Sequence, residues 1–100
     1  MTQTHTAHIT ACTLRLALPG CASLKGKRGM LMPLMAALRR QFGLAVAEID
    51  AQDLWGSAVL ACLTVSTETA HNHRVLQSAL RWLERNRPDV EIERWTLEEL

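Results

Sequence analysis

Apolar and polar side chains alternate over residues 8–18, with leucines and a cysteine on one side and smaller or polar residues on the other. A period of two predicts a β-strand with one buried face. Pro19-Gly20 is expected to end this strand. Ser23 is then placed to accept a backbone N–H bond as the cap of a helix that begins at Leu24.

Apolar residues next recur every three or four positions as far as Phe42, which is the spacing of an amphipathic helix, and Gly43 is expected to end it. Pro33 lies inside this helix and lacks a backbone N–H, so we expect a kink or a restart there. The same spacing predicts a second helix, capped by Thr69 and terminated by Pro88.

Three further segments, 44–54, 58–67 and 90–97, have the composition of strands. The glycine-containing turn at Trp55-Gly56-Ser57 joins the first two into a hairpin. The last strand changes phase at Arg94-Trp95, which predicts a bulge.

The resulting order, strand, helix, strand, strand, helix, strand, is that of a ferredoxin-like α+β sandwich, with a four-stranded antiparallel sheet and both helices on one face. Right-handed crossovers place the first and third strands in the centre. We expect one domain over residues 8–100, preceded by a disordered tail of residues 1–7. The open face of the sheet suits a partner better than a buried ligand.

Composition agrees with one compact domain, since 48 % of the 100 residues are hydrophobic and 21 % are charged. No apolar run approaches the ~18 residues of a membrane span, and the chain start lacks the order of an export signal. The three cysteines, Cys12, Cys21 and Cys62, form neither a disulfide framework nor a metal-ligand spacing. We therefore expect a cytoplasmic protein without metal or cofactor.

Charge is distributed unevenly along the chain. Residues 1–47 carry a net charge of +6, and the remaining residues carry −5. Such a molecule could present a basic surface that attracts phosphate, or opposite patches that help elements or subunits pair.

The start of the first helix is the candidate phosphate or RNA site. Ser23, Lys25, Lys27 and Arg28 surround a helix N-terminus, where exposed N–H groups and a partial positive charge favour anions. In the alternative interpretation Ser23 is only a cap, and the cations pair with carboxylates across the fold.

Three acids, Glu48, Asp50 and Asp53, stand on or just after the second predicted strand. A period of two places Glu48 and Asp50 on one face, where they could help hold Mg²⁺ or act as an acid and base pair. Because no further ligand is evident, we favour a structural role, bonding Lys27, Arg28 or the adjoining turn.

Trp55, near the hairpin turn, could stack on a base or a partner, but we favour a role in closing the end of the core. Trp95, at the irregular edge strand, is our candidate dimer contact. The middles of the first and third strands carry no aromatic residue for base stacking, as an RNA-recognition module of this architecture would.

Several separated motifs resemble the bacterial YlxP-like family, the domain of unknown function 503, over about residues 8–97. These motifs are Pro19-Gly20, Ser23-Leu24-Lys25-Gly26-Lys27-Arg28, Phe42, Ala47-Glu48-Ile49-Asp50, Asp53-Leu54-Trp55 and Ala58. The resemblance implies a ferredoxin-like domain. It also implies a link to translation or ribosome assembly, because genes of this family commonly lie beside those for a translation initiation factor and ribosome-binding factor A.

Together these features predict a non-enzymatic accessory factor that contacts RNA phosphate through the basic start of its first helix, with ribosomal RNA or ribosomal protein as partner. The alternative is a ligand-sensing or structural homodimer that pairs through the open sheet face. The sequence shows no convergent set of nucleophile, base and oxyanion donors, so we do not expect an enzyme. We expect no membrane partner.

Overall fold

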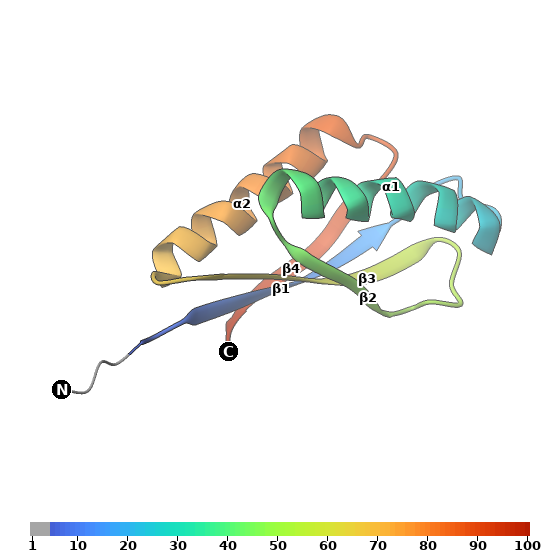
Figure 1. Cartoon of the computed structure of the whole chain (residues 1–100). Coiled ribbons are helices and arrows are strands. Elements are labelled where there is room, and N and C mark those ends of the chain that lie inside the picture. Colours follow the sequence, from blue (N-terminus) through green and yellow to red (C-terminus); the bar gives the residue numbers. More distant parts are fainter. Residues whose placement is uncertain (1–4) are drawn as a thin grey trace.

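A computed structural model describes residues 5–100 of the chain (Figure 1). Its elements follow the predicted order: β1 (His8–Ala17), α1 (Leu24–Phe42), β2 (Ala45–Asp50), β3 (Ser57–Ser66), α2 (Thr69–Asn86) and β4 (Glu91–Glu99). Of the expected tail, residues 1–4 lie outside the described residues, and residues 5–7 precede β1 without regular secondary structure.

The four strands form one antiparallel sheet in the order β2-β3-β1-β4. Both helices cover the same face of this sheet, and no helix or strand of residues 5–100 lies on the opposite face (Figure 1). The fold is therefore the predicted ferredoxin-like α+β sandwich, with β1 and β3 in the centre. Neither helix of the described chain is long and apolar enough to cross a membrane.

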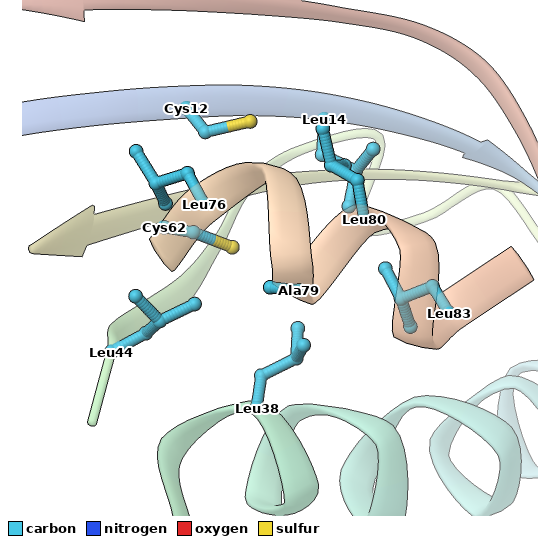
Figure 2. A pocket seen from close by; sticks show the side chains of 9 residues that line it. All are labelled: Cys12, Leu14, Leu38, Leu44, Cys62, Leu76, Ala79, Leu80 and Leu83. Carbon is cyan, nitrogen blue, oxygen red and sulfur yellow. The ribbon is translucent and has the colours of Figure 1, made fainter. Parts of the chain in front are cut away.

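The core lies between the sheet and the helices. Alternate residues of β1, including Leu14 and Leu16, face leucines of α1 and α2, and each such buried side chain stabilises the fold by about 1.5–3 kcal/mol. A small apolar cavity of about 10 Å³ remains between the layers (Figure 2). Its lining lacks the polar partners that an ordered water needs, so we expect it to be dry.

Two cysteines line this cavity from neighbouring strands. Cys12 of β1 and Cys62 of β3 lie directly opposite one another in the sheet, and both are buried (Figure 2). Burial raises the pKa of the Cys12 thiol to about 11 and that of the Cys62 thiol to about 12. These thiols therefore act as small apolar core groups at neutral pH.

α1 is one uninterrupted helix, so of the kink or restart predicted at Pro33 the restart is wrong. Pro33 is exposed, whereas Leu31 and Leu34 on either side are buried in the core, and their packing holds the helix together through the proline. The predicted end is confirmed: Gly43 adopts a left-handed conformation with φ 64° and donates its N–H to the carbonyl of Arg39.

α2 begins one residue earlier than predicted. Glu68 occupies the cap position, and no side chain bonds the first amides there, so the cap predicted at Thr69 is wrong. Ser66 stabilises the approach to the helix instead, because its Oγ accepts the N–H of Glu68 at 3.1 Å. The helix ends at Asn86, two residues before Pro88, as Pro88 predicts.

The two edge strands differ from their predicted bounds. β2 ends at Asp50 rather than at residue 54, because residues 51–54 turn toward α1. β4 extends to Glu99, and its pairing with β1 shifts between Arg15 and Leu16, opposite Glu93. The predicted bulge in the last strand is thus confirmed, one residue before the expected position.

Candidate functional site

Lys27 lies on the core side of α1, and its side chain is 0 % exposed. Its ammonium donates to the carbonyl oxygens of Ala51 at 2.6 Å and Leu54 at 2.8 Å, with that of Gln52 at 3.5 Å. These carbonyls belong to the β2–β3 loop, residues 51–56. Since a buried ammonium is costly without partners, these contacts hold the loop against the helix.

Glu48 of β2 supplies the counter-charge. Its Oε2 lies 2.9 Å from the Lys27 ammonium, and its Oε1 accepts a hydrogen bond from Arg28 at 2.7 Å. The Glu48 side chain is only 8 % exposed, and burial by itself would raise the pKa of its carboxyl group. The hydrogen bonds and charges of Lys27 and Arg28 outweigh burial, so the pKa of Glu48 lies below its ordinary value of 4.5.

Ser23 caps α1 as predicted. Its Oγ accepts the N–H of Gly26 at 2.9 Å, and its carbonyl accepts the N–H of Lys27 at 3.0 Å. The Ser23 hydroxyl and the Gly26 amide are therefore bonded to one another within the chain, which lowers the capacity of this helix end to bind an anion.

The three cations predicted to contact phosphate differ in how far they are exposed and in whether they are paired within the chain. Lys27 cannot contact phosphate, so that prediction is wrong, because its ammonium is enclosed by the loop carbonyls and Glu48. Arg28 keeps 43 % of its side chain exposed but is paired with Glu48. Lys25 is exposed and forms no ion pair within residues 5–100.

The burial of Lys27 has a signal in the sequence. It lies four residues before Leu31 and seven before Leu34, so it belongs to the apolar stripe of the helix rather than to its charged face. A lone lysine on a core-facing stripe implies a buried partner, and Glu48 is the acid that supplies it.

The predicted pairing of Glu48 with Asp50 on one face is wrong. The register between β2 and β3 shifts between these two acids, so Glu48 lies opposite the core residue Leu60 and Asp50 lies opposite Val59 on the other face. Asp50 accepts the N–H of Ala51 at 2.7 Å, which is a turn contact. In the described chain, no three His, Cys, Asp or Glu side chains come close enough together to hold a metal ion.

The β2–β3 loop is fixed at both ends as well as by Lys27. The N–H of Leu54 donates to the carbonyl of Ala51 at 3.0 Å, and that of Leu18 donates to the carbonyl of Gly56 at 2.9 Å. Ala51 has φ 61°, a left-handed conformation that is strained for alanine and is held by these contacts. The loop is therefore a preorganised surface rather than a flexible connection.

This loop exposes two large apolar side chains, Leu54 at 54 % and Trp55 at 52 %. Trp55 thus does not close the end of the core, and the interpretation we favoured is wrong, because the backbone bonds of the loop turn it toward solvent. Asp53 directly precedes the pair in the chain, and both Asp53 and Asp50, the last residue of β2, are exposed. Figure 1 shows the loop beside the start of α1, so Lys25 and Arg28 belong to the same end of the molecule.

A second polar cluster, not anticipated from sequence, lies at the start of α2. Asn72 and Thr10 are both 0 % exposed. The Asn72 amide donates to the carbonyl of His8 at 2.8 Å and accepts from Ser66 at 2.6 Å, and Thr10 donates to Glu99 at 2.7 Å. In the sequence, Thr10 lies two residues before the core residue Cys12, and Asn72 lies four residues before the core residue Leu76. Polar side chains at such core-facing positions are expected to be buried and hydrogen-bonded.

Glu99 also lies 2.6 Å from Nε2 of His73. The hydrogen bonds from His73 and Thr10 lower the pKa of the Glu99 carboxyl. Every polar atom discussed in this cluster is bonded to another, so the cluster ties β4 to α2 and leaves no group aimed at a ligand.

The fold and the site together define a small ferredoxin-like domain whose polar motif at the start of α1 is mainly an internal anchor. A family model described as "Protein of unknown function (DUF503)" matches residues 9–96. The chain therefore belongs to this family. A search of curated proteins gives no match. The motif residues Lys27, Glu48 and Leu54 meet at one place in the fold, where the loop is attached to the helix.

Proposed function

We propose that the protein is a non-enzymatic accessory factor of translation or ribosome assembly that acts by binding a protein partner through the β2–β3 loop. The link to translation is supported by the family resemblance seen in the sequence. The binding surface is supported by the loop geometry, and one observation carries it: a buried ammonium holds a strained loop in place, and that loop exposes Leu54 and Trp55.

Rigid presentation of these side chains favours binding. Tryptophan is enriched among the residues that dominate interface energies, because it buries a large area with few rotatable bonds. A loop already held in its bound conformation loses little entropy on association. Lys27 therefore contributes to binding by positioning Trp55 rather than by touching the partner.

The surrounding charges favour a basic protein segment over RNA. Asp53, two residues before Trp55, and Asp50, at the end of β2, are both exposed. They would repel phosphate, whereas they would attract lysine or arginine of a partner. Glu48 neutralises part of the positive charge at the start of α1. Phosphate contact would then depend on Lys25 and on the exposed part of Arg28.

Co-sedimentation with purified ribosomal subunits from the source organism tests this proposal. Trp55→Ala should weaken binding about tenfold or more, because it removes the central apolar contact. Trp95→Ala is the matched control, since Trp95 is also exposed but lies on β4, and it should change binding less than about twofold. Circular dichroism would verify that both variants fold.

The same assay distinguishes RNA as the partner. If Lys25→Glu abolishes binding, if Trp55→Ala leaves it unchanged and if affinity falls steeply with salt, the contact is to phosphate and the protein partner is wrong. If the wild-type chain does not sediment with either subunit at low salt, the link to the ribosome is wrong.

A further inference from the structure

The outer flank of α2 carries a stripe of arginines. Arg74, Arg81 and Arg85 follow one another at intervals of seven and four residues, with Ser78 between the first two. This spacing places them on one side of the helix, over a length of about 16 Å at about 1.5 Å per residue. All three arginines are exposed, and none forms an ion pair within residues 5–100.

A groove runs along this stripe, between α2 and the end of α1. It consists of two open hollows, of about 400 Å³ and about 300 Å³, and both are lined by Phe42 of α1 and Ser78 of α2. Arg74 lines the first hollow, and Arg81 and Arg85 line the second. Figure 1 shows the end of α1 beside α2. Because the hollows share two residues, we treat them as one surface, the α2 groove.

Apolar surface lies between the arginines of the α2 groove. Val75, Trp82 and Phe42 line it, and each is half-buried. The rings of Phe42 and Trp82 meet edge to face, with centroids 6.2 Å apart, so the core fixes their position. Arg81 donates to Oγ of Ser78 at 3.2 Å and makes no other hydrogen bond within residues 5–100. Its remaining N–H groups are therefore free for a ligand.

Acidic side chains border the α2 groove but do not line it. Glu84, the one acid of α2, lies two residues after Trp82, about 200° around the helix, and lines neither hollow. Glu68, at the start of α2, lines a separate hollow together with Arg74, so the groove ends there. The lining of the α2 groove thus contains three arginines and no carboxylate.

We propose that the α2 groove binds single-stranded RNA, with its arginines on phosphates and with bases against the edge formed by Phe42 and Trp82. Guanidinium groups match phosphate oxygens with paired hydrogen bonds. Aromatic surface between cations suits a single strand, because its unpaired bases expose their faces. A duplex offers phosphates but hides its bases, and an acidic peptide has carboxylates but no bases for the aromatic edge.

This proposal does not depend on the role of the β2–β3 loop. The loop lies beside the start of α1, whereas the α2 groove is formed at the end of α1 by Phe42. The two surfaces therefore occupy different ends of the same helix, and each can be altered without changing the other.

Fluorescence anisotropy of the full chain with a labelled oligouridylate of about 12 nucleotides tests the proposal. We expect a dissociation constant of roughly 1–100 µM at low salt, and three phosphate contacts predict a slope of about −2 for log affinity against log salt. Arg81→Glu should weaken binding at least about fivefold, because it replaces a phosphate contact with repulsion. Arg81→Gln, which only removes the charge, should weaken it about threefold. Circular dichroism would verify that both variants fold.

Arg94→Glu on β4 is the matched control. Arg94 is also exposed and without an ion pair within residues 5–100, so this variant changes the net charge by the same amount outside the groove. It should weaken binding less than about twofold, as should Lys25→Glu at the start of α1. Trp55→Ala should leave RNA binding unchanged, so the failure of this proposal and the failure of the loop's role are distinguishable.

Four results would overturn the proposal. The first is no binding at hundreds of micromolar protein in low salt. The second is an equal loss for Arg81→Glu and Arg94→Glu, which would reduce the effect to net charge. The third is tighter binding of an RNA duplex of the same length, and the fourth is equal competition by an oligoglutamate peptide, which would make the groove a site for acidic protein segments.

Discussion

Lys27 shows how one residue can connect a helix, a strand and a loop. Its buried ammonium contacts two carbonyls of the loop and the carboxylate of Glu48. Ser23 could be placed from sequence because capping is a local interaction between neighbours. The pairing of Glu48 with Lys27 and Arg28 is confirmed, since the acids of this segment were expected to bond these cations or the adjoining turn. The loop carbonyls of Ala51 and Leu54 could not be predicted as partners, because every residue carries a backbone carbonyl.

Removing the charge of Lys27 should destabilise the fold strongly. Lys27→Met keeps most of the volume but leaves Oε2 of Glu48 and two loop carbonyls without their donor, so we expect a loss of about 3–5 kcal/mol in the free energy of unfolding. Urea denaturation followed by circular dichroism measures it. The control, Lys25→Met at the exposed neighbouring position, should change stability by less than about 0.5 kcal/mol, and equal effects would contradict the anchor.

Glu48 should make stability depend on pH in the acid range. Its folded-state pKa is lower than that of the unfolded chain, so its contribution is complete above pH 4.5 and is lost as the pH falls through the folded value. Glu48→Gln should be less stable at pH 7 and should lose less stability than wild type between pH 5 and about 3. Urea midpoints over this range measure the difference, and parallel pH profiles would refute it.

At the scale of elements, alternation and helical spacing located every strand and helix within a few residues, because burial of one face is a repeated signal. The errors lie where a distant contact acts. β2 is shorter than predicted because Lys27 draws residues 51–54 out of the strand direction. The shift between Glu48 and Asp50, which separates the predicted acid pair, cannot be read from a period of two.

Pro33 tests whether the core packing of α1 overrides the low helix propensity of proline. Its ring removes one hydrogen bond from a helix that the buried leucines maintain. Pro33→Ala should therefore stabilise the protein by about 1–3 kcal/mol and raise the melting temperature by several degrees. Since Pro33 is exposed, no core contact is lost. Calorimetry measures the change, and an unchanged or lower melting temperature would show that the proline is accommodated without cost.

At the scale of the whole molecule, the topology followed from element order and crossover handedness alone. The charge asymmetry between the two halves of the chain had two interpretations, and the ion pairs of Lys27 and Arg28 with Glu48 are internal pairings of the basic half with the acidic half. Leu54, Trp55 and the preceding Asp53 are exposed in the β2–β3 loop, and the total composition of the chain does not reveal this.

The binding role of the β2–β3 loop is the central claim, and photo-crosslinking tests it most directly. A photoreactive p-benzoylphenylalanine placed at position 55 and irradiated with purified ribosomal subunits should crosslink to a basic protein, whereas the same group at exposed Gln77 on α2 should not. Crosslinks from position 55 to RNA, or equal yields from both positions, would contradict the account.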